Sequence, residues 1–272
     1  MSQLIIQSNA KQSIFGIIKD VARYKDLLWI LAWRDYKVRY AQTFLGFLWA
    51  FLQPITTLII FTFIFSRVAK LDTGNIPYAI FAQTGMITWV YFSFLIGQAG
   101  SSIAAAQGMI KKIYFPRLII PLSKAVVGLI DFGISLLLFF LLCLYFQFSP
   151  SGNVIFLPIF LLLVVVGGLG IGIWTSALTV RYRDFRQVIP FVVQLGMYVS
   201  PIAYSLQQVP EKYAFLYTLN PMVGVIEGVR WCLIGGSNPG FEVLYSAVIL
   251  LFIFVTSLYY FKRVENVMAD IL

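Results

Sequence analysis

The sequence has no histidine among its 272 residues and little charge, since only 11% of its residues are Asp, Glu, Lys or Arg. Histidine is the commonest general base and the commonest metal ligand in proteins, so its absence argues against histidine-based and metal-dependent catalysis. No glycine is followed by lysine, so the phosphate-binding loop of P-loop ATPases is missing. We therefore expect no catalytic residue, no metal site and no bound cofactor in this chain, and no hydrolysis of ATP by it.

The cysteines and acidic residues are too sparse to form a recognisable site. Cys143 and Cys232 lie in or near apolar runs without a CxxC or other ligand spacing, which predicts small buried side chains and neither a disulfide nor a zinc site. The lack of an Asp-x-Asp pair weakens the interpretation of the chain as a membrane glycosyltransferase with a metal-bound sugar nucleotide. Asp131 lies inside an apolar run, where we favour a helix–helix hydrogen bond or an ion pair over a proton relay.

What the sequence has in abundance is apolar surface, because 60% of its residues are hydrophobic and its charge-free runs reach the length of a membrane span. We predict an all-α polytopic membrane protein, with a cytoplasmic segment at 1–43, a single transmembrane domain at 44–262 and a cytoplasmic tail at 263–272. Small residues spaced four apart, Gly168, Gly172 and Ser176, predict that a neighbouring helix approaches closely. The six transmembrane helices are predicted at about 44–66, 76–98, 125–148, 154–180, 188–206 and 241–262.

The basic residues predict how the spans are oriented. Seven Lys and Arg residues precede the first span, four lie between the second and third, three between the fourth and fifth, and two after the sixth. Sixteen of the twenty would thus lie on one side, which the positive-inside rule identifies as the cytoplasm, with both termini there. The net charge of +9 then reflects loops that face anionic membrane lipids, and we expect no binding of nucleic acid.

An amphipathic helix is predicted just before the first span. Trp29, Trp33, Tyr36 and Tyr40 recur at offsets of four, three and four, which places their rings on one helical stripe flanked by Lys and Arg. We favour a helix that lies in the cytoplasmic interface of the membrane. The alternative is an ordinary helix that packs on a soluble partner.

A re-entrant helical hairpin is predicted at about 207–237, between spans five and six. Asn220-Pro221 suit the N-cap and the first helical position, and two glycines at 235–236 end the helix. This helix would be about 21 Å long, too short to cross the bilayer. Glu227 and Arg230 can pair on it at i and i+3. A buried structural salt bridge and an outer gate are both open interpretations of this pair.

Four motifs follow one another along the chain. They are Arg34-Asp35-Tyr36-Lys37-Val38-Arg39-Tyr40 with Leu45-Gly46-Phe47-Leu48-Trp49 and Gln53-Pro54; Lys111-Lys112-Ile113-Tyr114-Phe115-Pro116-Arg117 with Pro121; Arg181-Tyr182-Arg183-Asp184-Phe185; and Leu219-Asn220-Pro221 with Glu227 and Arg230. Together they resemble the permease subunits of polysaccharide-exporting type-2 ABC transporters. Within that group the sequence looks most like the lipopolysaccharide O-antigen exporters, and the resemblance covers residues 27–262, nearly the whole chain.

The resemblance implies an ATP-driven exporter that moves a lipid-linked, O-antigen-like polysaccharide across the bacterial inner membrane from the cytoplasmic side. It implies a homodimer of this permease, two separate nucleotide-binding ATPase subunits that hold ATP and Mg²⁺, and an undecaprenyl-linked glycan that threads between the permeases. The alternative within this group is export of capsular polysaccharide or teichoic acid by the same mechanism. A secondary carrier and a membrane-embedded transferase acting on lipid-linked substrates are the alternatives from other classes.

The expected glycan path depends on aromatic rings and uncharged hydrogen-bonding groups, which suit the C–H faces and hydroxyls of a sugar. Phe191, Gln194 and Tyr198 share one stripe of span five. Because Gln194 and Tyr198 need a partner or water within the membrane, we predict that they line the path. For a similar aromatic stripe on span one, we favour packing of the rings on lipid or on other helices. The second explanation is that this stripe also lines the glycan path. The span-one stripe includes Phe47, Phe51 and Phe61.

A permease without its own ATPase must receive motion through cytoplasmic contacts. Between spans two and three, residues 101–110 are predicted to form a short helix that ends at Phe115-Pro116 and acts as a rigid lever. Arg183 and Asp184, in the turn between spans four and five, are predicted to lie close to the same ATPase subunit. Retained topology and anionic lipid are the simpler explanation of the basic residues. The predicted docking residues are Gly108, Met109, Ile110, Lys111, Lys112 and Tyr114.

Overall fold

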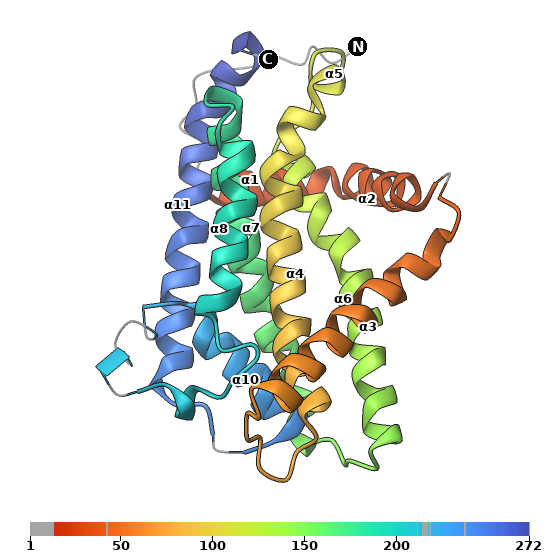
Figure 1. The fold of residues 1–272 in the computed structure, drawn as a ribbon. Helices are drawn as coiled ribbons and strands as arrows, with labels where there is room; N and C mark the ends of the chain where they lie inside the picture. The colour runs from red at the N-terminus through yellow and green to blue at the C-terminus, as the bar shows by residue number, and fades with distance from the viewer. Residues whose placement is uncertain are drawn as a thin grey trace.

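The computed structural model describes residues 14–41, 43–210, 212–213, 217, 219–236 and 238–271. The regular structure of these residues is entirely helical, as predicted, and the long helices run side by side as a bundle (Figure 1). The elements are α1 (Ile14–Arg23), α2 (Lys25–Tyr40), η1 (Gly46–Leu48), α3 (Trp49–Phe61), η2 (Thr62–Val68), α4 (Tyr78–Ala105), α5 (Gln107–Ile110), α6 (Ile119–Tyr145), η3 (Gly152–Phe156), α7 (Leu157–Arg181), α8 (Phe185–Val199), η4 (Leu206–Gln208), α10 (Met222–Ile234) and α11 (Phe241–Ile271).

Five helical stretches of the described chain are long and apolar enough to cross a membrane, and they correspond to predicted spans one to four and six. Three helices run further than predicted, because α4 continues to Ala105, α6 begins at Ile119 and α11 continues to Ile271. Residues 263–271 of the predicted cytoplasmic tail continue α11, and the location of this tail stays a prediction. The five stretches are Gly46–Val68, Tyr78–Ala105, Ile119–Tyr145, Gly152–Arg181 and Phe241–Glu265.

The fifth predicted span, 188–206, is wrong in its extent. Its helix, α8, has 15 residues and ends at Val199, which gives a length of about 22 Å. Ser200 is extended and residues 201–204 bend away from the helical path. Pro201 explains the end of α8, because the residue before a proline disfavours the helical conformation and proline has no N–H to donate. Whether α8 crosses the bilayer stays a prediction.

The centre of the bundle is the close pair formed by α4 and α7. A Cβ added to Gly168 would lie 2.7 Å from the Cβ of Leu95, and one added to Gly172 would lie 2.7 Å from the Cβ of Ala99. Ser176, one turn further along α7, is fully buried. The predicted close approach of a neighbouring helix is thereby confirmed, and close packing of this kind holds helices together where lipid weakens the hydrophobic driving force.

The helix α2 lies crosswise to the long helices (Figure 1). It packs on the bundle through Leu31 and Ala32, which are buried, whereas Trp29 and Trp33 are 63% and 57% exposed. The side chain of Tyr40 lies outside the described residues. A crosswise helix with exposed tryptophans suits the predicted interfacial helix, because their amphipathic rings prefer the headgroup layer.

The short helix expected in the outer hairpin is α10, Met222–Ile234. Asn220 caps it, since its Oδ1 accepts the N–H of Met222 at 3.0 Å. Gly235 and Gly236 end it with φ of +80° and +105°, a conformation that side chains disfavour. The helix α10 is too short to cross the bilayer, but it is buried against α4 and α11, so protein covers it. The hairpin residues 211, 214–216, 218 and 237 lie outside the described residues.

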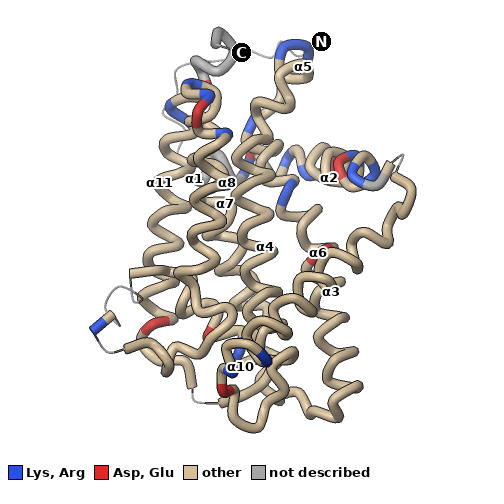
Figure 2. Tube along the Cα trace, viewed as in Figure 1, with Lys and Arg blue, Asp and Glu red and all other residues tan. Residues whose placement is uncertain are grey.

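Lysine and arginine gather along α2 and at the end of the bundle that carries α5 and the end of α11 (Figure 2). Fewer lie at the opposite end, which carries α10. This distribution matches the one expected from the sequence, with its basic loops on one side. We call the two ends of the bundle the α5 end and the α10 end.

Candidate functional site

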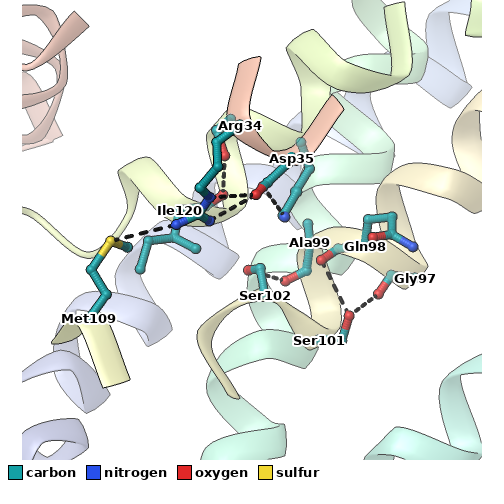
Figure 3. Close-up of polar contacts among 11 residues, drawn as sticks. Arg34, Asp35, Gly97, Gln98, Ala99, Ser101, Ser102, Met109 and Ile120 are labelled. Carbon is teal, nitrogen blue, oxygen red and sulfur yellow. Dashed lines mark hydrogen bonds and ion pairs between the residues drawn. The ribbon is translucent and has the colours of Figure 1, made fainter. Parts of the chain in front are cut away.

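Asp35 is the centre of an ion-pair network between α2 and α6. Its carboxylate accepts a bond of 2.8 Å from Nη2 of Arg34 and one of 2.5 Å from Nζ of Lys124 (Figure 3). The side chains of Asp35 and Lys124 are only 18% and 14% exposed, so water screens this pair less than an ordinary surface pair. Burial raises the pKa of Asp35, but the hydrogen bonds from Lys124 and Arg34 outweigh burial and hold that pKa below its ordinary value.

Arg34 also joins α2 to α5, one of the predicted coupling elements. Its Nη1 lies 4.0 Å from Sδ of Met109, as the dashed line in Figure 3 marks. A thioether is a weak acceptor, so this contact positions more than it stabilises. The neighbouring residues Arg34 and Asp35 therefore contact both α5 and the start of α6.

Arg39 anchors the other end of α2. Its Nη1 forms an ion pair with Oδ2 of Asp131 in α6. Its guanidinium lies 5.2 Å from the ring centroid of Phe94 in α4, within the range of a cation–π contact. The ion pair that we favoured for Asp131 over a proton relay is thus present, and it ties α2 to the bundle.

The helix predicted over 101–110 is wrong in its form. The helix α4 ends at Ala105, Ala106 interrupts it, and α5 adds only one turn, which ends at Ile110. The helix therefore stops before Phe115-Pro116. Phe115 is buried, so the chain has to turn back toward the bundle before it reaches the proline.

The predicted docking residues divide into an exposed set and an inner set. Lys111 and Lys112 are exposed, and Tyr114 is 76% exposed. Met109 and Ile110 are half-buried and pack against the core. Gly108, Arg183 and Asp184 are also exposed, the last two in the turn between α7 and α8. Figure 1 shows this turn at the same end of the bundle as α5. The surface available to a partner at the loop is therefore centred on Lys111, Lys112 and Tyr114.

The structure places the predicted path residues on two helical segments, the first span and α8. On α8, Phe191 and Tyr198 are 60% and 63% exposed and Gln194 is exposed too. On the first span, Phe47 is exposed, Phe51 and Phe61 are half-buried, and the rings of Phe47 and Phe51 meet edge to face at 5.5 Å. The helix α3 packs chiefly on α4 and α6, and α8 packs chiefly on α4 and α7. The two stripes therefore lie on helices that both pack on α4.

Glu227 and Arg230 form the predicted pair on α10. Nη1 of Arg230 donates to Oε1 of Glu227 at 2.8 Å. Arg230 is only 4% exposed and Glu227 is 30% exposed. The guanidinium of Arg230 also lies over the ring of Phe81 in α4, 4.0 Å from its centroid. The buried ion pair is therefore present, and a gating role stays a prediction.

Comparison with known sequences decides the family. The ABC-2 type transporter model matches residues 26–234, from α2 to the end of α10. The chain belongs to the ABC-2 type transporter family. It is similar to the O-antigen export system permease protein RfbA of Klebsiella pneumoniae, with 29% identity over 250 residues, 91% of this chain and 95% of the relative.

Two further relatives align with most of the chain. The O-antigen export system permease protein RfbA of Myxococcus xanthus is 28% identical over 212 residues, 77% of this chain and 81% of the relative. The polysialic acid transport protein KpsM of Escherichia coli is 23% identical over 237 residues, 86% of this chain and 92% of the relative. The family match over residues 26–234 includes both the ion-pair network of α2 and the buried pair of α10.

Sequence reasoning missed several partners in this ABC-2 chain. It singled out Asp35 only within a motif and gave Lys124 no role, because nothing in the sequence relates two residues that are 89 positions apart. It also missed Tyr78, whose hydroxyl donates to a carbonyl of the segment after α8. It missed Phe81 as well, whose ring lies under the guanidinium of Arg230. The isolated charge of Arg230 in an apolar helix was the one available signal, since such a charge requires buried partners.

Proposed function

We propose that the chain is the permease subunit of an ATP-driven exporter that moves a lipid-linked polysaccharide across a bacterial inner membrane, from the cytoplasmic to the outer side. The family match carries the proposal, together with the export permeases that the chain covers nearly end to end. The proposed cargo is an O-antigen-type glycan on undecaprenyl, because the relatives named for O-antigen export are the more similar ones.

The exporter comprises two copies of this chain and two nucleotide-binding subunits, which hold ATP and Mg²⁺. The missing phosphate-binding loop supports separate ATPase subunits. The exposed apolar side chains of α3 and α8 support a second copy, since a partner chain would cover part of them. The α5 end, with its basic residues, faces the cytoplasm in this arrangement.

Energy enters through the surface formed by Lys111, Lys112 and Tyr114. The contact of Arg34 with Met109 and the bond of Asp35 with Lys124 support a route from this surface into α2 and α6. The helix α2 continues within a few residues into the first span. Motion of the loop is thereby passed to α3, which carries one of the two aromatic stripes.

Deletion of the gene tests the proposed function. We expect full-length undecaprenyl-linked glycan to accumulate on the cytoplasmic side, and a plasmid copy of the gene to restore export. If lipid-linked glycan fails to form at all, the chain acts in synthesis, as a transferase would. If the accumulated polymer is capsular polysaccharide and not O-antigen, the mechanism stands and the cargo changes.

A further inference from the structure

The segment that follows α8, residues 200–205, is not helical; residues 200–203 are buried, and Tyr204 and Ser205 are half-buried. Ser200, Ile202 and Ala203 are 0%, 2% and 6% exposed. A helix satisfies its own backbone carbonyls, but a buried, non-helical segment must find donors elsewhere. The position of these six residues therefore depends on the side chains that donate to them.

Three successive carbonyls of this segment accept hydrogen bonds from side chains of α4 and α10. The carbonyl of Ile202 accepts from Nη2 of Arg230 at 2.8 Å, and that of Tyr204 accepts from Nη1 at 3.3 Å. The carbonyl of Ala203, between them, accepts from the hydroxyl of Tyr78 at 2.8 Å. One arginine and one tyrosine thus hold the segment from two helices.

Arg230 suits this task because its guanidinium is a rigid fork of donors. The same side chain binds Glu227 at 2.8 Å and lies on the ring of Phe81, so its position is determined on several sides. Lysine would keep the positive charge but not the planar fork that reaches two carbonyls and a carboxylate together. The carbonyl bonds and the ion pair can therefore be separated by substitution.

The shape of α4 also fits the segment. A Cβ added to Gly85 would lie 2.8 Å from the carbonyl oxygen of Ile202 and 3.2 Å from Nη2 of Arg230. Only glycine leaves room for the segment to seat against α4 at this position. Gly97, on the same helix, has nothing within 4 Å of the corresponding Cβ position.

The segment is linked to the proposed path on one side and to open space on the other. The hydroxyl of Tyr204 donates to the carbonyl of Tyr198, a proposed path residue, at 3.2 Å. An open hollow of about 870 Å³ at the α10 end is lined by residues that include Ser205, Glu227 and Arg230. A water-soluble reagent therefore has a way to the edge of the segment.

We infer that Arg230 and Tyr78 form a clamp that holds residues 200–205 closed at the α10 end of α8, and that release of this clamp opens the outer end of the path. Glu227 orients Arg230 and is not itself the clamp. What passes through the opening rests on the proposed function. The closed position of residues 200–205 is inferred only from the contacts described above.

The test measures how often the segment opens. A single cysteine replaces Ala203 in a background in which Cys143 and Cys232 are replaced by alanine, and a membrane-impermeant maleimide is applied to membranes with the α10 end outside. The labelling rate follows the population of the open segment when reclosing is fast. We expect Arg230→Lys to raise the rate about tenfold, because hydrogen bonds from a charged donor to buried carbonyls are lost. Gly85→Ala should raise it as well, by displacing the segment.

The controls separate the clamp from a simple ion pair and from general instability. Glu227→Gln keeps a side-chain oxygen that can accept from Arg230, so it should raise the rate much less than Arg230→Lys. Gly97→Ala should leave the rate unchanged. Tyr78→Phe removes one hydroxyl and should raise the rate even if Arg230→Lys fails to insert. The clamp is overturned if Glu227→Gln raises labelling as much as Arg230→Lys, or if inserted Arg230→Lys and Tyr78→Phe proteins label at the unmodified rate. The assay needs no glycan, so the deletion experiment can fail while the clamp holds.

Discussion

Asp35 shows how a single residue in a membrane protein can connect elements that are distant in sequence. It lies in α2, bonds Lys124 at the start of α6, and shares Arg34 with Met109 in α5. A carboxylate with two cationic partners is stabilised in its charged form. Removal of the carboxylate would leave Lys124, which is little exposed, without this anionic partner.

Asp35→Asn should lower the free energy of unfolding by about 1–3 kcal/mol at neutral pH, because it breaks a partly shielded charged pair. The pKa of Asp35 is depressed in the folded chain, so its contribution is present above the unfolded pKa, about 3.9, and is lost as pH falls through the folded value. Thermal unfolding in detergent should therefore show a constant difference between the two proteins from pH 8 to 6. The difference should disappear only in strong acid.

The exchanged variant Asp35→Lys/Lys124→Asp supplies the control for this prediction. It restores opposite charges at the same two positions, so it should recover part of the lost stability. An Asp35→Asn protein as stable as the unmodified one at pH 7 would show that the pair contributes nothing.

At the scale of elements, the close contact between α4 and α7 should be sensitive to substitution. Gly172→Leu should lower stability by about 1–3 kcal/mol or prevent folding, since even a Cβ meets Ala99 and the carbonyl of Leu95 at 2.7 and 3.0 Å. Gly133→Leu is the matched control, because that glycine of α6 is exposed with nothing within 4 Å of its Cβ position. The measurement is the fraction of detergent-extracted protein that remains monodisperse on heating. Equal loss in both variants would contradict the packing argument.

The loop after α4 should be the docking element for the ATPase. Single cysteines at Lys112 and Tyr114, both exposed, should cross-link in membranes to a partner of ATPase size. A cysteine at Met109, which is half-buried against the bundle, should cross-link less. The background lacks Cys143 and Cys232. If the complex copurifies while neither exposed cysteine gives an adduct, the loop is not part of the interface.

Much of the helical architecture could be predicted, because long apolar runs and basic loops determine where helices lie and which ends are charged. The extents of α8 and α5 could not, for different reasons. Pro201 was a signal for the end of α8. The donors that satisfy the carbonyls of the buried, non-helical segment after it come from α4 and α10, which are distant in the sequence. The early end of α5 depends on the burial of Phe115, a tertiary contact that overrides the local signal of Phe115-Pro116.

At the scale of the whole molecule, the two aromatic stripes raise a question of assembly. The stripe of α8 and the stripe of the first span belong to helices that pack on α4 with different neighbours, α7 for one and α6 for the other. The proposed second copy of the chain would close a path along these two stripes. The stripe of α8 is the stronger candidate wall, because lipid accepts phenylalanine freely but gives no partner to the amide of Gln194.

The double variant Gln194→Leu/Tyr198→Leu tests this wall. It removes an amide and a hydroxyl from an exposed face while keeping apolar side chains there, so folding and insertion should be preserved. Export should fall by about tenfold, since hydrogen bonds that are formed with a moving sugar contribute about 0.5–1.5 kcal/mol each. ATP hydrolysis by the partner should continue. The matched control is Val192→Leu/Val199→Leu, which changes two exposed apolar residues on another stripe of the same helix. Surface glycan after induction gives the readout, and normal export by inserted Gln194→Leu/Tyr198→Leu protein would place the path elsewhere.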